Sequence, residues 1–139
     1  KVTEKSKDNP VFYVQYAYAR ISSIFRNLNL KMDKNIEIKD NEFLLNNHEI
    51  EILKKIAEWP RCIEITTSKL EPHIIPTYLY ELCNLFHSYW NLGNKKKEFR
   101  FINEENNSVS NSRLLILQSL AIVISNGMKI LGVSTPNNM

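Results

Sequence analysis

The chain has 139 residues, of which 43% are hydrophobic and 24% charged, with a formal net charge of +3. This length suits one domain with a buried core, and only 3 glycines and 5 prolines argue against a β-sandwich or a disordered chain. The mildly basic balance fits an anionic partner, although many ordinary domains carry as much. Cys62 and Cys83 form no C-x-x-C pair, so we expect no disulfide framework or zinc knuckle, and a reduced, cytoplasmic setting.

The first predicted element is a helix that starts at Asn9-Pro10, with the asparagine as its cap and the proline in its first turn. A second stripe on this helix, opposite its apolar face, contains Tyr13, Tyr16 and Arg20. The apolar face itself is expected to consist of Val14, Tyr18, Ile21, Phe25 and Leu28. Two tyrosines and an arginine that face away from the core are candidates for binding a ligand or packing against another helix.

The next segments alternate between polar connections and helices. Residues 29–40 are polar and predict a connection. Asn46 and Glu49 have the spacing of a capping box at the start of a second helix, which Pro60 is expected to end. A short helix is predicted from about residue 61 to residue 70.

A fourth helix is predicted from about residue 76 to residue 90. Its apolar face is expected to contain Leu79, Leu82, Phe86 and Tyr89. Tyr80, Asn84 and His87 recur at helical spacing on the other side. This stripe again combines an aromatic ring with hydrogen-bonding groups.

A long connection, rich in Asn, Ser and Lys, is predicted at about residues 91–112, and connections of this length inside a domain are often functional. Lys95, Lys96 and Lys97 precede Phe99 and Phe101 in it. Lysines contact phosphates and aromatic rings stack on unpaired bases, which would suit a nucleic acid. An equally good interpretation is a solvated loop whose phenylalanines pack back onto the domain.

The last helix is predicted from about residue 112 to residue 131, with Gly132 placed to end it. It is apolar nearly all round, so we expect it to be the central and most buried helix. Its most hydrophobic stretch, residues 114–125, is too short to span a bilayer and is interrupted by polar residues. The sequence therefore predicts an all-α bundle of about five helices that is not in a membrane.

Little in the sequence indicates catalysis. His48, His73 and His87 lie in different segments, and no Ser-His-Asp order or phosphate-binding glycine loop is present. Cys83 and His87 are four residues apart and could form half of a metal site, but no second pair at ligand spacing completes it. We expect no catalytic residue and no metal site in this chain.

Four stretches, in order, resemble the C-terminal anticodon-binding domain, of the DALR type, of bacterial-type arginyl-tRNA synthetases. They are NPVFYVQYAYAR (9–20), LLNNHEIEILKKIAEWP (44–60), LEPHIIPTYLYELCNLFHSYWN (70–91) and NSRLLILQSLAIVISNGMKILGVSTPNNM (111–139). The resemblance covers about residues 9–139. It implies a helical bundle that binds the anticodon stem-loop of tRNA-Arg. Residues 1–8 would then be a remnant of the connection to a catalytic domain upstream.

The resemblance also implies which side chains meet the RNA. The expected tRNA-binding residues are Tyr13, Tyr16, Arg20, Tyr80, Asn84, His87, Lys95, Lys96, Lys97 and Met139. The parent enzyme would use ATP and magnesium to join arginine to tRNA in its catalytic domain, so this chain would supply recognition and need no cofactor. A cytoplasmic monomer is expected.

Two departures from the family pattern stand out, and two alternatives remain. Residues 118–121 read QSLA where the family has its DALR tetrapeptide, and Tyr18 stands where the family often has histidine. One alternative is the related domain of another synthetase, such as the glycyl β subunit. The other is a helical protein-interaction module that binds no RNA.

Overall fold

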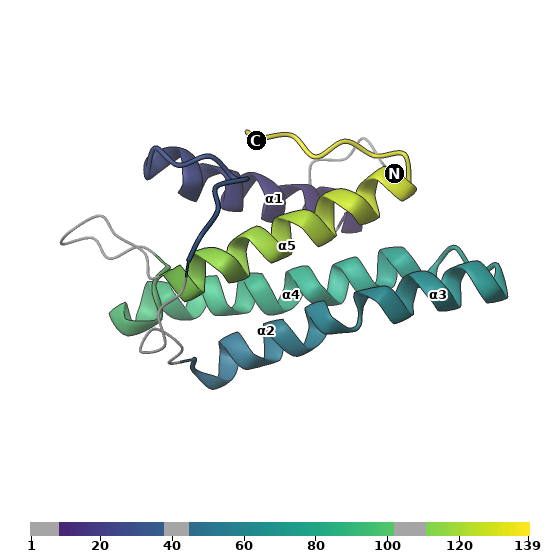
Figure 1. The fold of residues 1–139 in the computed structure, drawn as a ribbon, viewed down its shortest axis with the longest axis horizontal. Helices are drawn as coiled ribbons and strands as arrows, with labels where there is room; N and C mark the ends of the chain where they lie inside the picture. The colour runs from purple at the N-terminus through teal and green to yellow at the C-terminus, as the bar shows by residue number, and fades with distance from the viewer. Residues whose placement is uncertain (1–8, 38–44, 102–110) are drawn as a thin grey trace.

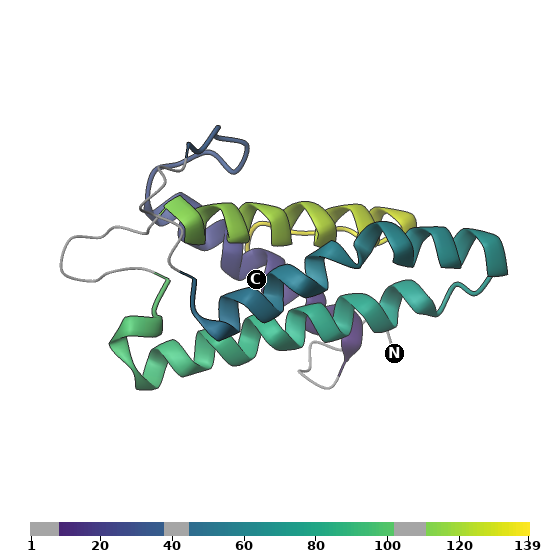
Figure 2. The same cartoon turned by 60° about the horizontal axis from the view of Figure 1, so that its bottom comes forward.

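The computed structural model describes residues 9–37, 45–101 and 111–139. These residues contain no strand and form five α-helices and one short 3-10 helix. The elements are α1 (Pro10–Asn27), α2 (Asn47–Ala57), α3 (Trp59–Lys69), α4 (Ile74–Lys95), η2 (Lys97–Phe99) and α5 (Asn111–Ile130). Helices α2 and α3 follow one another along the molecule, and α4 returns beside both (Figures 1 and 2). In the view of Figure 1, α1 and α5 lie above these helices. The expected all-α bundle of about five helices is confirmed.

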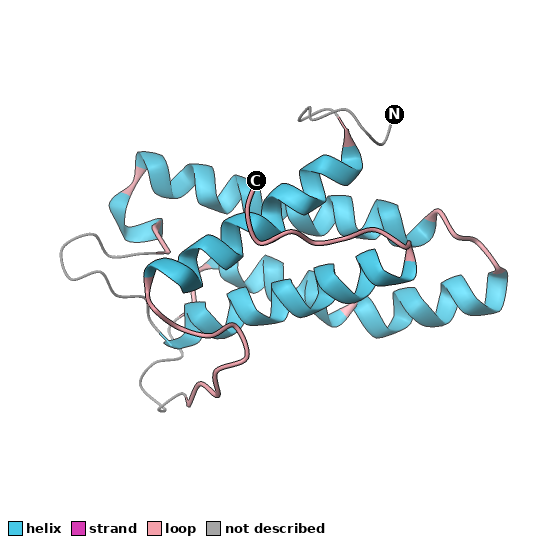
Figure 3. Ribbon diagram, turned by 90° about the horizontal axis from the view of Figure 1, so that it is seen from above, coloured by secondary structure: helices cyan, strands magenta, loops and turns pink. Residues whose placement is uncertain are grey.

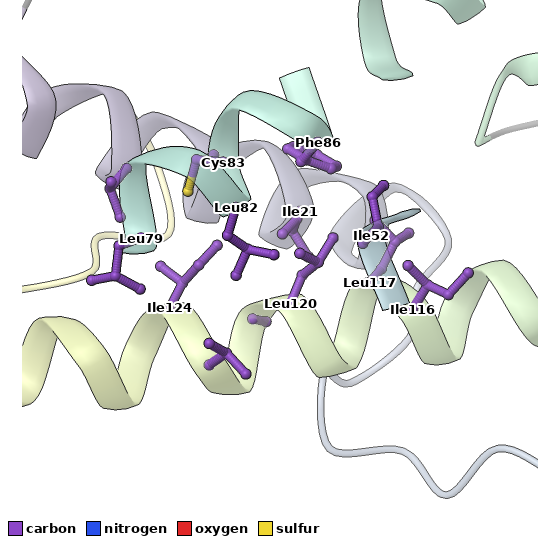
Figure 4. Close-up of a cluster of buried hydrophobic side chains, with 14 of the residues drawn as sticks. Ile21, Ile52, Leu79, Leu82, Cys83, Phe86, Ile116, Leu117, Leu120 and Ile124 are labelled. Carbon is purple, nitrogen blue, oxygen red and sulfur yellow. The ribbon is translucent and has the colours of Figure 1, made fainter. Parts of the chain in front are cut away.

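The core lies where α5 meets α4 and α1. Leu117, Leu120 and Ile124 of α5 have no exposed surface. Ile124 points toward Leu79 and Leu82 of α4, Leu120 toward Ile21 of α1, and Leu117 lies beside Ile52 of α2 (Figure 4). Burial of side chains of this size stabilises a fold by roughly 1.5–3 kcal/mol each. The last helix is therefore buried in the core as predicted, although α4, which contacts α1, α2, α3, η2 and α5, is the more central helix.

Helix α5 is nevertheless not buried all round. Ile122 and Ile130 are 60% and 55% exposed, and Leu131, at the predicted end of the helix, is half-buried. Among the described helices, α5 has the length and composition to cross a membrane, with half of that stretch buried inside the bundle. Core helices of globular proteins share this length and composition, so the feature is weak evidence for a membrane segment.

Two helix starts differ from the sequence prediction, and proline explains both. Helix α3 begins at Trp59 rather than at about residue 61, so Pro60 lies in its first turn. Helix α4 begins at Ile74, which places Pro76 in its first turn as well. Proline is tolerated there because the first N–H groups of a helix have no partner within the helix.

The predicted Asn46 cap at the start of α2 is present, but Glu49 binds the side-chain amide of Asn46 instead of its backbone N–H, and the pair extends into a buried polar network. The Asn46 Oδ1 accepts from the backbone N–H of Glu49 at 2.9 Å, and its amide donates to the Glu49 Oε1 at 2.7 Å. Glu49 is only 2% exposed, and its Oε1 also accepts from the Tyr89 hydroxyl and lies 3.6 Å from the Arg113 Nε. A carboxylate can be buried here because these donors replace part of its hydration. The network ties α2 to α4 and α5.

The C-terminal tail folds back over α1. Gly132 adopts a left-handed conformation with φ +72°, and the Val133 N–H donates to the Met128 carbonyl at 2.9 Å, as in a Schellman motif. This turn reverses the chain after α5, and the tail then runs back across the molecule (Figure 3). The Gln15 side chain of α1 donates to the Ser134 carbonyl at 3.0 Å. The tail is thereby positioned beside the outer surface of α1.

Gln118, the first residue of the QSLA stretch at the place of the family's DALR tetrapeptide, holds the segment that follows α1. The Gln118 side-chain amide donates to the carbonyls of Met32 at 3.0 Å and Lys34 at 2.6 Å. The expected polar connection is thus confirmed for residues 29–37, and residues 38–40 lie outside the described part of the chain. Where the family pattern has aspartate, this chain uses an amide to bind backbone carbonyls.

Candidate nucleic-acid interface

Four of the predicted binding residues form one cluster where α1 packs against α4. The Tyr13 hydroxyl donates to the Asn84 Oδ1 at 3.2 Å. The ring of Tyr13 also lies 5.1 Å from that of Tyr80 and 4.5 Å from that of His87, measured between centroids. The two stripes that the sequence placed on separate helices therefore face each other across this contact.

Arg20 is held at the edge of this cluster by three aromatic side chains. Its Nη2 donates to the Tyr16 hydroxyl at 3.1 Å, and its Nη1 lies 3.2 Å from the His87 Nδ1. The guanidinium carbon lies 4.7 Å from the centre of the Tyr16 ring and 4.5 Å from the centre of the Trp90 ring, both within cation–π range. Arg20 is thus fixed in place rather than free in solvent.

Trp90 is a site residue that the sequence reasoning misses. It lies three residues after His87, so the helical spacing of the polar stripe extends to it. That spacing is the available signal, whereas the sequence prediction treats the tryptophan only as the end of the helix. The structure shows it half-buried, with its ring beside Arg20.

The separation of α1 into a core face and an outer stripe is less sharp than predicted. Tyr13 and Tyr18 are both half-buried and both pack against the core. Helix α1 contacts α4 and α5, and Ala17 and Ile24, which lie between the two predicted stripes, are buried as well.

Burial, with a smaller effect of neighbouring Tyr80, raises the pKa of Tyr13, so its phenol stays a hydrogen-bond donor at neutral pH.

A hollow of about 330 Å³ opens beside Arg20. Its walls come from α1, from the end of α4 and from the C-terminal tail. The side chains that matter most for its chemistry are Tyr16, Arg20, Arg26, Trp90, Asn137 and Met139. Among the residues that the structure describes, two arginines and no carboxylate side chain line the hollow, so it is suited to a planar or anionic group.

The tail wall of the hollow is fixed to α1 by two hydrogen bonds to one residue. The Ser22 hydroxyl donates to the Asn137 Oδ1 at 3.2 Å, and the Arg26 Nη1 donates to the Asn137 carbonyl at 3.3 Å. Met139, two residues further, is 51% exposed and lines the hollow with Tyr16. The predicted site residues at the two ends of the chain are therefore brought together.

The three predicted lysines follow the helix end that forms one wall of the hollow. Lys95 is the last residue of α4, which continues past its predicted end at residue 90. Lys96 follows it, Lys97 is the first residue of η2, and all three side chains are exposed. The structure does not place them in the lining of the hollow. They are available for contacts with a longer anionic partner.

Of the predicted long connection at 91–112, residues 91–95 belong to α4, and residues 102–110 lie outside the described part of the chain. The helix continues because η2 packs against it. The Arg100 Nε donates to the Gly93 carbonyl at 2.9 Å, and a Cβ at Gly93 would lie 3.1 Å from the Arg100 Cα. Glycine at this position permits that close approach.

The two phenylalanines of this connection pack onto the bundle. Phe101 is 4% exposed, and its ring lies 4.8 Å from that of Tyr89. Phe99 is half-buried, with its ring edge-to-face with that of His48 at 5.6 Å. Of the two interpretations left open above, the structure therefore supports packing, and neither ring is placed to stack on a base.

Cys83 and His87 do not form the start of a metal site. Cys83 has no exposed surface, and burial raises the pKa of its thiol. Both ring nitrogens of His87 lie near other groups, the Arg20 guanidinium and the Tyr13 carbonyl. Within the described ranges, no group of three His, Cys, Asp or Glu side chains is arranged to hold a metal ion.

The fold of the described residues is that of an anticodon-binding helical domain. Residues 14–139 match the family described as the DALR anticodon binding domain, and the chain belongs to this family. It is 57% identical over 139 residues to the arginine–tRNA ligase of Pelagibacter ubique and 44% identical over 144 residues to that of Bartonella bacilliformis. All of this chain is covered in both comparisons, but only 24% and 25% of the two ligases.

A solved structure gives the same fold. The Thermus thermophilus arginyl-tRNA synthetase superimposes with a TM-score of 0.72, covering 96% of this chain and 22% of that one, at 22% identity. The chain thus spans about a quarter of the length of the curated relatives it matches. The resemblance read from the sequence is confirmed.

Proposed function

We propose that this domain binds the anticodon stem-loop of tRNA-Arg as the recognition part of an arginine–tRNA ligase. The observation that carries the proposal is the hollow between α1, α4 and the tail, where Arg20 lies between the rings of Tyr16 and Trp90. An unstacked anticodon base would enter this hollow, with Met139 at its rim. The relatives are arginine–tRNA ligases, which supports arginine as the amino acid, and the geometry supports the mode of binding.

The chemistry of the hollow supports RNA in particular. Sequence-specific RNA recognition targets unpaired bases, which stack on aromatic rings or guanidinium planes. Each stacked base contributes roughly 1–3 kcal/mol to binding. Arg20 and Arg26 offer donors to base carbonyls or phosphates, and the described lining has no carboxylate side chain to repel an RNA. Lys95, Lys96 and Lys97 would add phosphate contacts along the stem.

The remaining predicted residues would act around this hollow. Tyr80 is 43% exposed and Asn84 is exposed, so both can reach a bound loop. Tyr13 is half-buried between them and His87. His87 itself is only 6% exposed, which leaves little of its ring for a direct contact with RNA.

The arginylation reaction would belong to the part of the ligase beyond this chain. That part would hold ATP, magnesium and arginine, and the described residues would contribute no catalytic group. The parent enzyme would act in the cytoplasm as a monomer, with its own catalytic domain as the partner of this one.

A direct binding experiment tests the proposal. We would titrate the 139-residue chain into labelled anticodon stem-loops of tRNA-Arg and measure fluorescence anisotropy at several salt concentrations. We expect preferred binding of the arginine anticodon, with an affinity that falls linearly on a log–log plot against salt. Preference for a glycine anticodon would favour the related glycyl-type domain. Absence of binding to any stem-loop would support a protein-interaction module instead.

A further inference from the structure

We propose that His87 is a positioning residue for RNA binding, which holds the Arg20 guanidinium toward the hollow without touching the RNA. This inference rests on the proposed function. It is carried by the 3.2 Å distance between the Arg20 Nη1 and the His87 Nδ1, together with the burial of His87. The sequence alone predicts the opposite, a histidine that contacts RNA directly.

The hydrogen-bond chemistry of the contact defines the state of the imidazole. A guanidinium has only donors, so the His87 Nδ1 must present its lone pair to Arg20. The proton of a neutral imidazole then lies on Nε2, which is 3.3 Å from the Tyr13 carbonyl and donates to it. One tautomer therefore satisfies both contacts, and it joins the backbone of α1 to an arginine side chain about two turns further along the same helix.

The surroundings of His87 explain why it would act through Arg20. The ring is covered by the Tyr13 ring at 4.5 Å and by the Phe86 ring at 5.5 Å, measured between centroids. The Tyr16 ring stacks on it at 5.8 Å. With 6% of its surface exposed, the imidazole reaches the hollow only through the guanidinium that it binds.

The orientation of the Arg20 guanidinium depends on such an acceptor. Within the parts of the chain that the structure describes, it makes no ion pair with a carboxylate, and its partners are the Tyr16 hydroxyl and the His87 Nδ1. The rings of Tyr16 and Trp90 restrict where the guanidinium lies, and the two neutral acceptors fix its rotation. An arginine held in this way has already lost much of its rotamer entropy before RNA binds, which favours affinity. Its positive charge is also left for the RNA.

Two substitutions test the roles of the two ring nitrogen atoms of His87 one at a time. In His87→Asn, the amide oxygen lies near the position of Nδ1 and can still accept from Arg20. In His87→Gln, the amide nitrogen can replace Nε2 and donate to the Tyr13 carbonyl, but no acceptor remains near Nδ1. We expect His87→Gln to weaken binding of the tRNA-Arg stem-loop by about tenfold, the loss of one hydrogen bond to a charged group. His87→Asn should bind within about threefold of the unchanged chain.

A double-mutant cycle with Arg20→Ala gives the decisive comparison. If His87 acts through Arg20, His87→Gln should cause no further loss once Arg20 has been replaced. An equal loss in both backgrounds would overturn the proposal, because His87 would then act by itself or through the fold. So would equal binding by His87→Gln and the unchanged chain. Thermal unfolding of each variant shows whether a loss of binding reflects a loss of structure.

A second measurement tests the positioning without RNA. In the unchanged chain and in His87→Asn, NMR of the Arg20 guanidinium should show slow rotation about its terminal bonds. In His87→Gln this rotation should become fast. Fast rotation in the unchanged chain would overturn the inference even if the chain binds tRNA-Arg. Failure of the unchanged chain to bind any stem-loop, with slow Arg20 rotation, would instead refute the proposed function and the role in RNA binding, while His87 would still be shown to position Arg20.

Discussion

Gly127 of α5 lies directly against the Leu79 side chain of α4. A Cβ at Gly127 would lie 2.8 Å from the Leu79 Cδ1 and 2.9 Å from its Cδ2, and Leu79 has no exposed surface. Glycine inside a helix is normally unfavourable by about 1 kcal/mol relative to alanine. Here it lets the two central helices approach each other in the middle of the core.

We therefore expect Gly127→Ala to destabilise the domain despite the better helix propensity of alanine. The new methyl group must displace Leu79 within a closely packed core, and overpacking of this kind costs roughly 1–3 kcal/mol. Urea unfolding followed by circular dichroism measures the free energy of unfolding. The control is Asn126→Ala at the exposed neighbouring position, which should raise stability by about 0.5 kcal/mol through helix propensity alone. A more stable Gly127→Ala variant would show that the helices can separate at this point.

The second prediction concerns the centre of α5. Leu120 has no exposed surface, so Leu120→Ala should lower the free energy of unfolding by about 2–5 kcal/mol, the range for a buried leucine with its cavity. Ile122→Ala removes a side chain that is 60% exposed and should have a much smaller effect. Amide hydrogen exchange should be slowest within α5. Rapid exchange throughout residues 114–131 would contradict its central position.

Local signals predict most of the helices. The Asn9-Pro10 pair predicts the start of α1, and the Asn9 Oδ1 accepts from the Val11 N–H at 3.0 Å as a cap should. The helical spacing of Leu79, Leu82 and Phe86 predicts the buried face of α4, and all three have no exposed surface. Such signals act within one or two turns, so they can be read from the chain itself.

The parts that the sequence does not predict depend on contacts between distant segments. Asn137 holds the tail through Ser22 and Arg26, more than a hundred residues earlier. Helix α4 runs to Lys95, because the segment from η2 to Arg100 folds back on it, although the sequence predicts a connection from about residue 91. The burial of His87 follows from where α1 crosses α4. Periodicity places a side chain on a face of its helix, but it does not show what covers that face.

The third prediction concerns the two thiols. Burial raises the pKa of both Cys83 and Cys62, and at Cys62 a hydrogen bond with Thr66 and the charge of Lys55 partly oppose this. A raised pKa means less thiolate at a given pH, and the thiolate is the form that reacts. In the native chain near neutral pH, both cysteines should therefore react slowly with iodoacetamide.

The two cysteines should also differ from each other. Cys62 is 7% exposed and lines a hollow of about 460 Å³, whereas Cys83 has no exposed surface. Mass spectrometry should show Cys62 labelled before Cys83, and both labelled quickly in urea. Labelling of Cys83 in buffer at its rate in urea would mean that α4 opens readily, against its buried position.

The fourth prediction separates charge from base recognition. Replacing the three lysines at residues 95–97 with alanine should weaken binding to arginine and non-arginine stem-loops alike, because exposed lysines contact phosphates. The slope of log affinity against log salt should flatten by roughly one for each phosphate that is no longer neutralised. The matched control is alanine at Lys54, Lys69 and Lys129, which are exposed on α2, α3 and α5. A selective loss for tRNA-Arg with an unchanged salt slope would show that the lysines at 95–97 read sequence.

The last prediction compares two tyrosines on α1. Tyr16 lines the hollow and accepts a hydrogen bond from Arg20, whereas Tyr18 packs against the core. Tyr16→Ala should leave the domain folded but weaken stem-loop binding by roughly 1–3 kcal/mol, the contribution of one stacked base. Tyr18→Ala should lower the melting temperature and leave the affinity of the folded chain nearly unchanged.

Anisotropy and thermal unfolding, measured on both tyrosine variants, distinguish these outcomes. If the proposed function holds, Tyr16→Ala in a ligase that contains this domain should reduce the use of tRNA-Arg, while ATP and arginine binding should stay intact because they would belong to a separate catalytic domain. If Tyr16→Ala unfolds the domain and Tyr18→Ala does not, the two side chains have the opposite roles on α1. Unchanged stem-loop affinity in a folded Tyr16→Ala chain would show that the base does not stack at this position.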